Sequence, residues 1–257
     1  MTRVLVVGAA GRMGESLVRN IAAAPDLRLG AALEHSLHAL QGSEIAPGVK
    51  LGSDPQAACA QADVALDFSS PTSTLALLDA AEPRGLPLVI GTTGLASDAE
   101  ARIARAAKRL AIVRAANFSI GVTVLLELVA EAARRLEGYE IEVLEMHHDQ
   151  KLDAPSGTAL ALARAAASAR GQELQDVAVY AREGQTGKRD PAEIGLQSLR
   201  LRDSVGEHTV YFAGSGERVE LAHRALSREN FTAGALRAAR WLIGRPPGLY
   251  AMRDVLS

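Results

Sequence analysis

Hydrophobic residues in the first half of the chain form short continuous runs that alternate with alanine-rich stretches of helical spacing. The runs are rich in Val, Ile and Leu and are apolar along their whole length, which is typical of strands buried on both faces of a parallel sheet. The expected strands are 4–7, 27–33, 63–68, 86–90 and 110–113, and the expected helices are 13–24, 55–61, 72–81 and 98–108. This alternation predicts an α/β fold with a doubly wound parallel sheet.

The pattern changes after residue 119. Three segments have helical spacing, and several other segments alternate polar and apolar positions in the way that half-exposed strands do. The expected helices are 120–136, 156–169 and 231–243, and the expected strands are 139–147, 177–180, 194–202, 208–213 and 219–225. We therefore expect a first domain over 1–118 and, over 119–227, a smaller α+β domain with a mixed open sheet.

Composition narrows the class of protein. The chain has 257 residues, of which 48% are hydrophobic and 23% charged, as in ordinary globular proteins. Its net charge of −2 offers no strong field to nucleic acid or to an anionic membrane, and no run approaches the ~20 apolar residues of a membrane span. Cys59 is the one cysteine, which fits a reducing compartment. We expect a cytoplasmic protein that binds neither nucleic acid nor membranes.

A glycine-rich turn, G-A-A-G-R-M-G at 8–14, follows the first expected strand and opens the first helix. Glycines let the backbone approach a pyrophosphate, and the free N–H groups of a helix start attract its charge. The spacing departs from the usual G-x-G-x-x-G, so a tight turn without a ligand is the alternative. Glu34, 20 residues after Gly14, ends the second strand, where an acidic side chain accepts from the ribose hydroxyls of adenosine. Because His35 follows, where Arg would favour a 2′-phosphate, the choice between NAD and NADP stays open.

Polar residues also follow the third, fourth and fifth expected strands. Each group taken alone fits ordinary capping and turn chemistry. Their shared place at the carboxyl edge of a parallel sheet, where ligands bind, makes a cofactor site the stronger interpretation. The groups are Asp67-Phe68-Ser69-Ser70-Pro71, Gly91-Thr92-Thr93-Gly94 and Ala115-Ala116-Asn117-Phe118.

The densest group of reactive side chains runs from Glu145 to Thr158, between an expected strand and a helix. His147 and His148 are adjacent on a strand and point to opposite sides, so they do not share one role. Lys151 is one of only four lysines among 28 basic residues, and Lys can release a proton where Arg cannot. The helix start at 156–158 suits a carboxylate. Reduction of a small carboxylated substrate needs an acid, a second proton donor and a site that binds an anion.

Other classes of function remain as alternatives at this point. A metal site made of His147, His148 and Asp149 is disfavoured, because adjacent residues rarely converge on one ion. Cys59 lies far from any expected strand end, which argues against a catalytic thiol and against a phosphorylating semialdehyde dehydrogenase. A regulatory module that binds NAD(H) without turnover would leave the spacing of His147 and Lys151 unexplained.

Taken together, these motifs resemble the dihydrodipicolinate reductase (4-hydroxy-tetrahydrodipicolinate reductase) family nearly end to end. The pattern H-H-x-x-K-x-D-A-P-S-G-T-A at 147–159 is the most specific part of the resemblance. The resemblance implies a Rossmann-like first domain and NAD(P)H-dependent reduction of 4-hydroxy-tetrahydrodipicolinate to tetrahydrodipicolinate with loss of water, in lysine biosynthesis through diaminopimelate. It also implies a cytoplasmic homotetramer joined through the sheet of the second domain, and the return of residues 228–257 to the first domain.

The resemblance further implies roles for individual residues and no metal. His147 matches the proton donor and acceptor of the family, and Lys151 its second proton donor. The matching substrate-binding positions are His148, Gly157 and Thr158. The matching NADH or NADPH contacts are Gly8, Ala9, Ala10, Gly11, Arg12, Met13, Glu34, His35, Gly91, Thr92, Thr93, Ala115, Ala116, Asn117 and Phe118. Two departures stand out: His35 where some members carry Arg, and a segment at 200–203 that is bulkier than the small-residue turn of the family.

Overall fold

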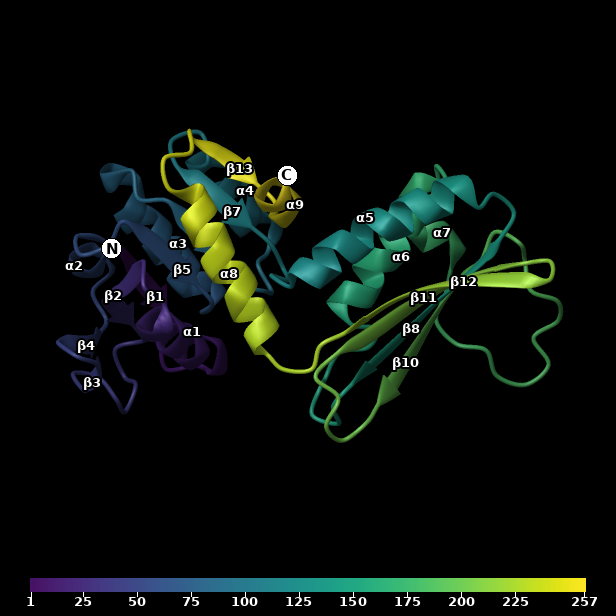
Figure 1. Ribbon diagram of the computed structural model, residues 1–257, viewed down its shortest axis with the longest axis horizontal. Coiled ribbons are helices and arrows are strands. Elements are labelled where there is room, and N and C mark those ends of the chain that lie inside the picture. The colour runs from purple at the N-terminus through teal and green to yellow at the C-terminus, as the bar shows by residue number, and fades with distance from the viewer. The chain divides into compact units, whose positions relative to one another are not determined.

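The computed structural model describes residues 1–257 and consists of two compact units (Figure 1). The first unit contains residues 1–120 together with 229–257, and the second contains residues 121–228. Two clusters of buried apolar side chains fill the first unit and a third fills the second. No helix in the chain combines the length and the apolar character that crossing a bilayer requires.

The first unit is built on an eight-stranded sheet in the order β13-β7-β6-β5-β1-β2-β4-β3. All its paired strands are parallel except β3 and β4 at one edge. The strands are β1 (Thr2–Val7), β2 (Leu27–Leu33), β3 (Glu44–Ala46), β4 (Val49–Gly52), β5 (Val64–Asp67), β6 (Leu88–Ile90), β7 (Ala111–Arg114) and β13 (Gly248–Tyr250). The predicted parallel sheet is confirmed.

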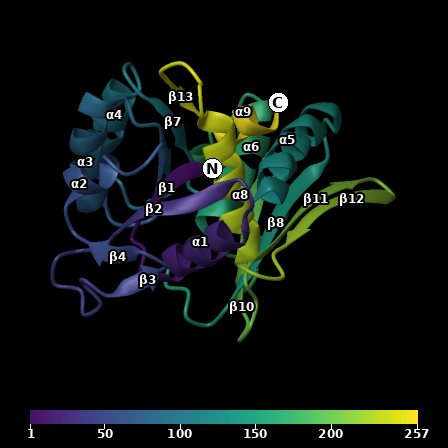
Figure 2. The same ribbon diagram turned by 60° about the vertical axis from the view of Figure 1, so that its left-hand side comes forward.

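Helices cover both faces of this sheet, which confirms the doubly wound arrangement (Figure 2). One core contains Leu17 of α1 and Leu242 of α8, and the other contains Leu77 of α3 and Ile103 of α4. The buried hydroxyls of Ser16 and Thr232, 2.9 Å apart, also link α1 to α8. The helices of the unit are α1 (Arg12–Ala23), α2 (Pro55–Cys59), α3 (Pro71–Ala81), α4 (Ser97–Ala106), α8 (Glu229–Leu242) and α9 (Met252–Leu256), with a 3₁₀ turn over Glu82–Arg84.

The second unit contains a five-stranded mixed sheet in the order β12-β11-β8-β10-β9. Strand β10 runs parallel to β8 and β9, whereas β11 runs antiparallel to β8 and β12. The strands are β8 (Glu140–His147), β9 (Ala178–Val179), β10 (Ile194–Arg200), β11 (Glu207–Gly214) and β12 (Glu217–Arg224), and the helices are α5 (Ile120–Arg135), α6 (Gly157–Ala169) and α7 (Leu174–Val177). The predicted mixed sheet is confirmed.

The helices of the second unit lie against one face of its sheet and leave the other face open (Figure 1). Ile141, Val143 and Phe212 alternate onto the covered face and are buried in the core with α5 and α6. Because side chains alternate along a strand, Glu145 and His147 continue this covered face toward the end of β8. The fold therefore places two polar side chains at the edge of an apolar core.

A few short elements differ from the sequence prediction. The predicted strand at 177–180 is wrong at both ends: Val177 ends α7, and only Ala178–Val179 pair with β10. Six short elements escape the sequence prediction, because none is long enough to show a period of its own. They are β3, β4, β13, α7, α9 and the 3₁₀ turn over Glu82–Arg84.

Candidate active site

The glycine turn of the first unit packs more closely than any side chain would permit. Gly8 has φ +78°, and a Cβ there would lie 2.7 Å from the carbonyl oxygen of Phe68. A Cβ on Gly14 would lie 2.6 Å from Cα of Ala9 and would overlap the carbonyl oxygen of Gly8. Helix α1 begins at Arg12, and no side chain caps its start. The turn therefore presents bare backbone and a helix N-terminus, which fits the pyrophosphate of a dinucleotide.

Glu34 lies beside this turn, as its position at the end of β2 requires. One carboxylate oxygen accepts from the backbone N–H of Ala10 at 3.4 Å and the other from that of His35 at 3.1 Å. His35 is exposed, and its ring packs edge-on against that of His38, with 5.3 Å between the ring centres. The structure thus brings Glu34 to the glycine turn and leaves the His35 imidazole at the surface.

The other polar strand ends gather around one hollow of about 340 Å³ in the first unit. Residues from the ends of β5 and β6 and from the segment after β7 line it together with α1 and α8. The lining residues are Met13, Phe68, Ser69, Gly91, Thr92, Thr93, Ala116, Asn117, Phe118 and Phe231. Seven predicted cofactor residues meet there, whereas Ala115 packs against the core instead. Phe231 comes from α8, more than 100 residues away in sequence, so strand-end reasoning could not find it.

The buried carboxylate of Asp67 ties these strand ends together. Its Oδ1 accepts from the backbone N–H and the hydroxyl of Ser69, and its Oδ2 accepts from the hydroxyl of Thr74 at 2.5 Å. The N–H of Ser69 also donates to the hydroxyl of Thr92 at 3.2 Å. Burial raises the pKa of Asp67, and the hydrogen bonds from these hydroxyls oppose that shift. Asp67 therefore shapes the edge of the hollow.

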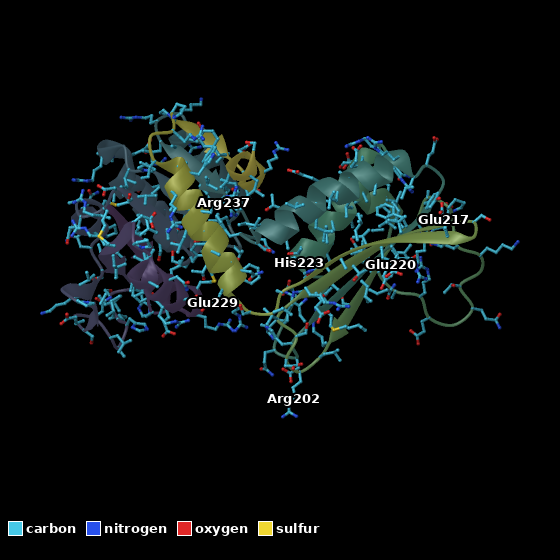
Figure 3. All side chains as sticks on the ribbon, in the orientation of Figure 1. Arg202, Glu217, Glu220, His223, Glu229 and Arg237 are labelled. Atoms are coloured by element: carbon cyan, nitrogen blue, oxygen red, sulfur yellow. The ribbon has the colours of Figure 1, made fainter.

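In the second unit, His147 is backed by the fully buried carboxylate of Glu145. The two residues lie on the same face of β8, and His147 Nδ1 is 2.5 Å from Glu145 Oε2. Arg200, at the end of the neighbouring strand β10, donates from Nη1 to both oxygens of Glu145 at 2.9 and 3.1 Å. Its Nη2 donates to the carbonyl of Asp153 at 2.6 Å. Arg202, two residues further along, is exposed and extends away from the sheet (Figure 3).

Glu145 stays ionised in this setting. Burial raises its pKa, but hydrogen bonds from His147, Ser198 and Arg200 outweigh burial and lower the pKa to about 2. An ionised carboxylate can only accept hydrogen bonds, so the proton between the two side chains is on His147 Nδ1. The unprotonated nitrogen of the neutral ring is then Nε2.

A buried hydroxyl–imidazole pair lies next to this group. Ser156 caps α6 through a 3.1 Å hydrogen bond from the N–H of Ala159, and its Oγ is 3.1 Å from His208 Nε2. The His208 ring packs edge-on against that of His147, with 5.2 Å between the ring centres. Burial, with a smaller effect of the neighbouring His147, lowers the pKa of His208 to about 4.

The remaining predicted residues of the second unit lie on the loop after β8 and on the first turn of α6. The ammonium of Lys151 donates to Asp153 Oδ1 at 2.7 Å rather than contacting His147. His148 and Thr158 are half-buried, and Gly157 is exposed. A Cβ on Gly157 would meet no atom within 4 Å, and its φ is not positive, so the fold itself does not require glycine there. Gly157 leaves open the space above the start of α6.

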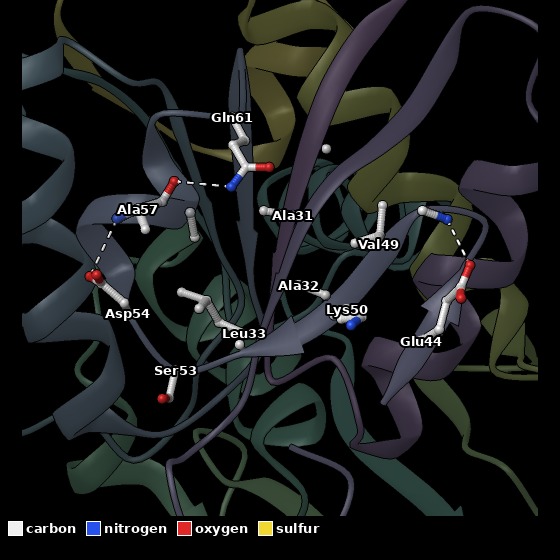
Figure 4. A pocket seen from close by; sticks show the side chains of 14 residues that line it. Ala31, Ala32, Leu33, Glu44, Val49, Lys50, Ser53, Asp54, Ala57 and Gln61 are labelled. Atoms are coloured by element: carbon white, nitrogen blue, oxygen red, sulfur yellow. Dashed lines mark hydrogen bonds between the residues drawn. The ribbon is translucent and has the colours of Figure 1, made fainter. Parts of the chain in front are cut away.

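A second hollow and the single cysteine show no sign of a catalytic or metal-binding role. A hollow of about 450 Å³ lies along β2, β4 and α2 (Figure 4), but Asp54 and Glu44 at its rim accept hydrogen bonds from their own loops. No group of three or more His, Cys, Asp or Glu side chains is arranged to hold a metal ion. Cys59 is buried, and burial raises the pKa of its thiol to about 11, which disfavours the reactive thiolate.

The fold and these two groups of residues define a class of protein, an oxidoreductase with a Rossmann-type dinucleotide-binding unit and a separate α+β unit. Comparison with known proteins gives the family. Residues 2–118 match the family "Dihydrodipicolinate reductase, N-terminus", and residues 121–256 match "Dihydrodipicolinate reductase, C-terminus". The chain belongs to the dihydrodipicolinate reductase family.

Individual relatives agree over the full length of the chain. A 4-hydroxy-tetrahydrodipicolinate reductase of Anaeromyxobacter dehalogenans is 48% identical, covering 100% of this chain and 98% of the relative. One of Thiobacillus denitrificans is 49% identical, covering 99% of this chain and 98% of the relative. Among solved structures, a dipicolinate-bound dihydrodipicolinate reductase from Paenisporosarcina sp. TG-14 superposes with a TM-score of 0.80 at 25% identity, covering 98% of this chain and 97% of that one. These findings establish a reductase of lysine biosynthesis.

Proposed function

We propose that this chain uses NADH or NADPH to reduce 4-hydroxy-tetrahydrodipicolinate to tetrahydrodipicolinate with loss of water, in the diaminopimelate route to lysine. One observation carries the proposal: the segment 147–158 places a carboxylate-backed imidazole, a lysine and an open helix start within one loop and its flanking elements. It does so in a chain 48% identical over its whole length to a reductase of that name.

The first unit is proposed to bind the dinucleotide. The bare turn at 8–14 suits the pyrophosphate, Glu34 suits the adenosine ribose, and the hollow at the strand ends suits the nicotinamide end. Bound there, the reduced nicotinamide supplies the hydride. The contacts we propose are Gly8, Ala9, Ala10, Gly11, Arg12, Met13, Glu34, His35, Gly91, Thr92, Thr93, Ala115, Ala116, Asn117 and Phe118. The exposed His35 imidazole decides no preference between NADH and NADPH by itself.

The second unit is proposed to bind the dicarboxylate. Helix α6 offers backbone N–H groups at its start, and Gly157 leaves the space above them open. His148, Gly157 and Thr158 are the substrate-binding residues in this proposal. A planar dicarboxylate, dipicolinate, is bound in the Paenisporosarcina enzyme, which supports the choice of ligand class.

His147 and Lys151 are proposed to supply the proton. Hydride addition at the ring carbon that carried the hydroxyl, after water has left, produces an enamine that one proton must quench. His147 gives this proton from Nε2 when its ring is doubly protonated, because Nδ1–H is held by Glu145. The ring then returns to its neutral form with the remaining proton on Nδ1. The ammonium of Lys151, held by Asp153, is the second donor.

The proposal also covers the domain boundaries, the oligomeric state and the cellular compartment. We take 1–118 with 228–257 as the dinucleotide-binding domain and 119–227 as the substrate-binding and oligomerisation domain of a cytoplasmic homotetramer. The uncovered face of the five-stranded sheet supports this assembly, because it carries the apolar side chains of Leu144, Met146 and Leu199. Cys59, buried and without a second cysteine to pair with, fits the reducing cytoplasm.

Isotope transfer tests the proposed reaction. With a reduced dinucleotide that carries deuterium at the nicotinamide C4, one deuterium should appear in tetrahydrodipicolinate at the carbon that carried the hydroxyl. A module that only senses NAD(H) would bind the same dinucleotide and transfer no deuterium to any product.

A further inference from the structure

We propose that Glu145 is a positioning residue that fixes His147 in the tautomer protonated at Nδ1, and that Arg200 holds the Glu145 carboxylate in place. This inference rests on the proposed role of His147 as proton donor. It adds two residues to which the family comparison and the sequence motifs assign no role.

The two oxygens of Glu145 accept hydrogen bonds from different sets of donors. Oε1 accepts from the backbone N–H of Ser156 at 3.3 Å and from Arg200 at 2.9 Å. Oε2 accepts from His147 Nδ1 at 2.5 Å and from Arg200 at 3.1 Å. Both oxygens are therefore occupied by donors in fixed directions, and only Oε2 faces the imidazole.

The buried charge of Glu145 needs a partner. Glu145 is 0% exposed, and an isolated buried carboxylate would be strongly destabilising. Arg200, whose side chain is 23% exposed, balances the charge and also bonds the carbonyl of Asp153. The guanidinium thereby joins the end of β8 to the loop that carries Lys151. The ion pair ties the imidazole, the start of α6 and the lysine loop into one arrangement.

The surroundings of the His147 ring leave Nε2 as its working nitrogen. A Cβ on Gly206 would lie 3.0 Å from His147 Nε2, so glycine at this position keeps the space at that nitrogen free of a side chain. The His208 ring packs against the imidazole from β11. With Nδ1 held by Glu145, Nε2 is the one nitrogen through which His147 can exchange a proton with a ligand.

The variant Glu145→Gln tests this relationship without changing the size of the side chain. The amide oxygen that this change introduces will take the Oε1 position, where the Ser156 N–H and Arg200 both donate. The NH₂ group then faces His147 Nδ1, which must become an acceptor, and the imidazole proton moves to Nε2. We expect two-bond ¹H–¹⁵N correlation spectra of histidine-labelled protein to show the Nδ1–H tautomer in the natural protein and the Nε2–H tautomer in E145Q.

Steady-state kinetics of E145Q distinguish a positioning role of Glu145 from a purely structural one. E145Q should lower kcat by about 100-fold or more while KM for the dinucleotide stays within about twofold. In a His147→Gln background the same change should cost little more, because Glu145 acts through the ring that is already gone. Glu140→Gln, an exposed glutamate at the start of β8, is the matched control and should leave the tautomer and kcat unchanged.

Glu145→Asp keeps the experiment decisive if E145Q does not fold. The shorter carboxylate retains the charge, so the Nδ1–H tautomer should persist with partial activity. The inference is overturned if the natural protein shows the Nε2–H tautomer, if E145Q keeps both tautomer and kcat, or if the losses from E145Q and H147Q simply multiply. The spectra need no substrate, so a natural protein without reductase activity would refute the proposed function and leave the tautomer result standing.

Discussion

The Nε2 atom of His208 lies 3.1 Å from the hydroxyl of Ser156, the residue that caps α6. The imidazole of His208 is buried, and its ring also packs against that of His147, one of the proposed proton donors. The other ring nitrogen, Nδ1, is buried and has no hydrogen-bond partner. A buried imidazole with one unsatisfied nitrogen is kept neutral at a cost that depends on pH.

His208 should make the protein less stable in mild acid. Its pKa is lowered to about 4 in the folded chain from 6.5, mainly by burial, so between these values the unfolded chain binds the extra proton. Stability from this group is therefore complete above pH 6.5 and declines as pH falls toward 4, by about 3 kcal/mol at most. Urea unfolding at pH 7.0 and 5.0 should show a smaller loss in His208→Gln than in the natural protein. His35→Gln, which removes an exposed imidazole, is the control, and an equal loss in all three proteins would contradict the prediction.

Two glycines should respond in opposite ways to the same substitution. Gly14→Ala should destabilise the first unit by about 1–3 kcal/mol or more and weaken dinucleotide binding, because its Cβ would collide with the Gly8–Ala9 backbone. Gly157→Ala should leave the melting temperature unchanged, since its Cβ meets no atom within 4 Å. It should instead raise KM for the dicarboxylate at least tenfold, with KM for the dinucleotide unaffected. An unchanged KM for the dicarboxylate would remove Gly157 from the proposed substrate site.

Asp67→Ala should lower the stability of the first unit and weaken NADH binding, because this one carboxylate ties the strand ends together. The change leaves the hydroxyl of Ser69 without its acceptor, at a cost of about 1–3 kcal/mol. The Ser69 N–H and the Thr74 hydroxyl each lose one of two acceptors and keep the Thr92 hydroxyl and the Ser70 carbonyl, respectively. The dissociation constant for NADH, measured by fluorescence titration, should rise as the edge of the hollow loosens. Asp79→Ala removes a 71% exposed carboxylate from an ion pair on α3 and should cost less than about 1 kcal/mol. Equal effects of the two substitutions would argue against the organising role of Asp67.

The sequence and the structure agree where a residue's role is set by its immediate neighbours in the chain. Unbroken apolar runs at Val4–Val7, Leu88–Ile90 and Ala111–Val113 mark the buried strands β1, β6 and β7. The segment 147–158 stands out because its reactive residues lie within twelve positions of one another in the sequence. The edge strands β3 and β13 contain three residues each, too few to display any alternation, so packing alone determines them.

Residues whose role depends on long-range pairing are harder to predict. Glu145 lies on the inward face of β8 in step with Ile141 and Val143, and a charged residue in that apolar series is the one signal that the sequence offers. In the sequence Arg200 stands out only as bulk in a turn, although its guanidinium lies against Glu145, 55 residues earlier in the chain. His208, on β11, contacts Ser156 at the start of α6, 52 residues earlier in the chain. Strand register, which a single sequence does not reveal, decides these contacts.

Removal of either proposed proton donor should lower turnover without unfolding the chain. His147→Gln and Lys151→Met should each reduce kcat by about 100- to 10,000-fold, the range expected for a general acid. Circular dichroism and the melting temperature should stay close to those of the natural protein, since both side chains lie at the margin of the core. Lys188→Met, on the exposed loop before β10, is a matched control that should leave kcat unchanged. Near-full turnover in both variants would show that the proton comes from elsewhere.

The most direct test of the account is the loss of reduced-nicotinamide absorbance in the presence of the purified protein. The unstable substrate would be generated in place from pyruvate and aspartate semialdehyde by the preceding synthase, with NADH and NADPH in parallel reactions. We predict oxidation that requires both the synthase and this protein, and the ratio of the rates with NADH and NADPH gives the cofactor preference. Dinucleotide binding without any synthase-dependent oxidation would contradict it.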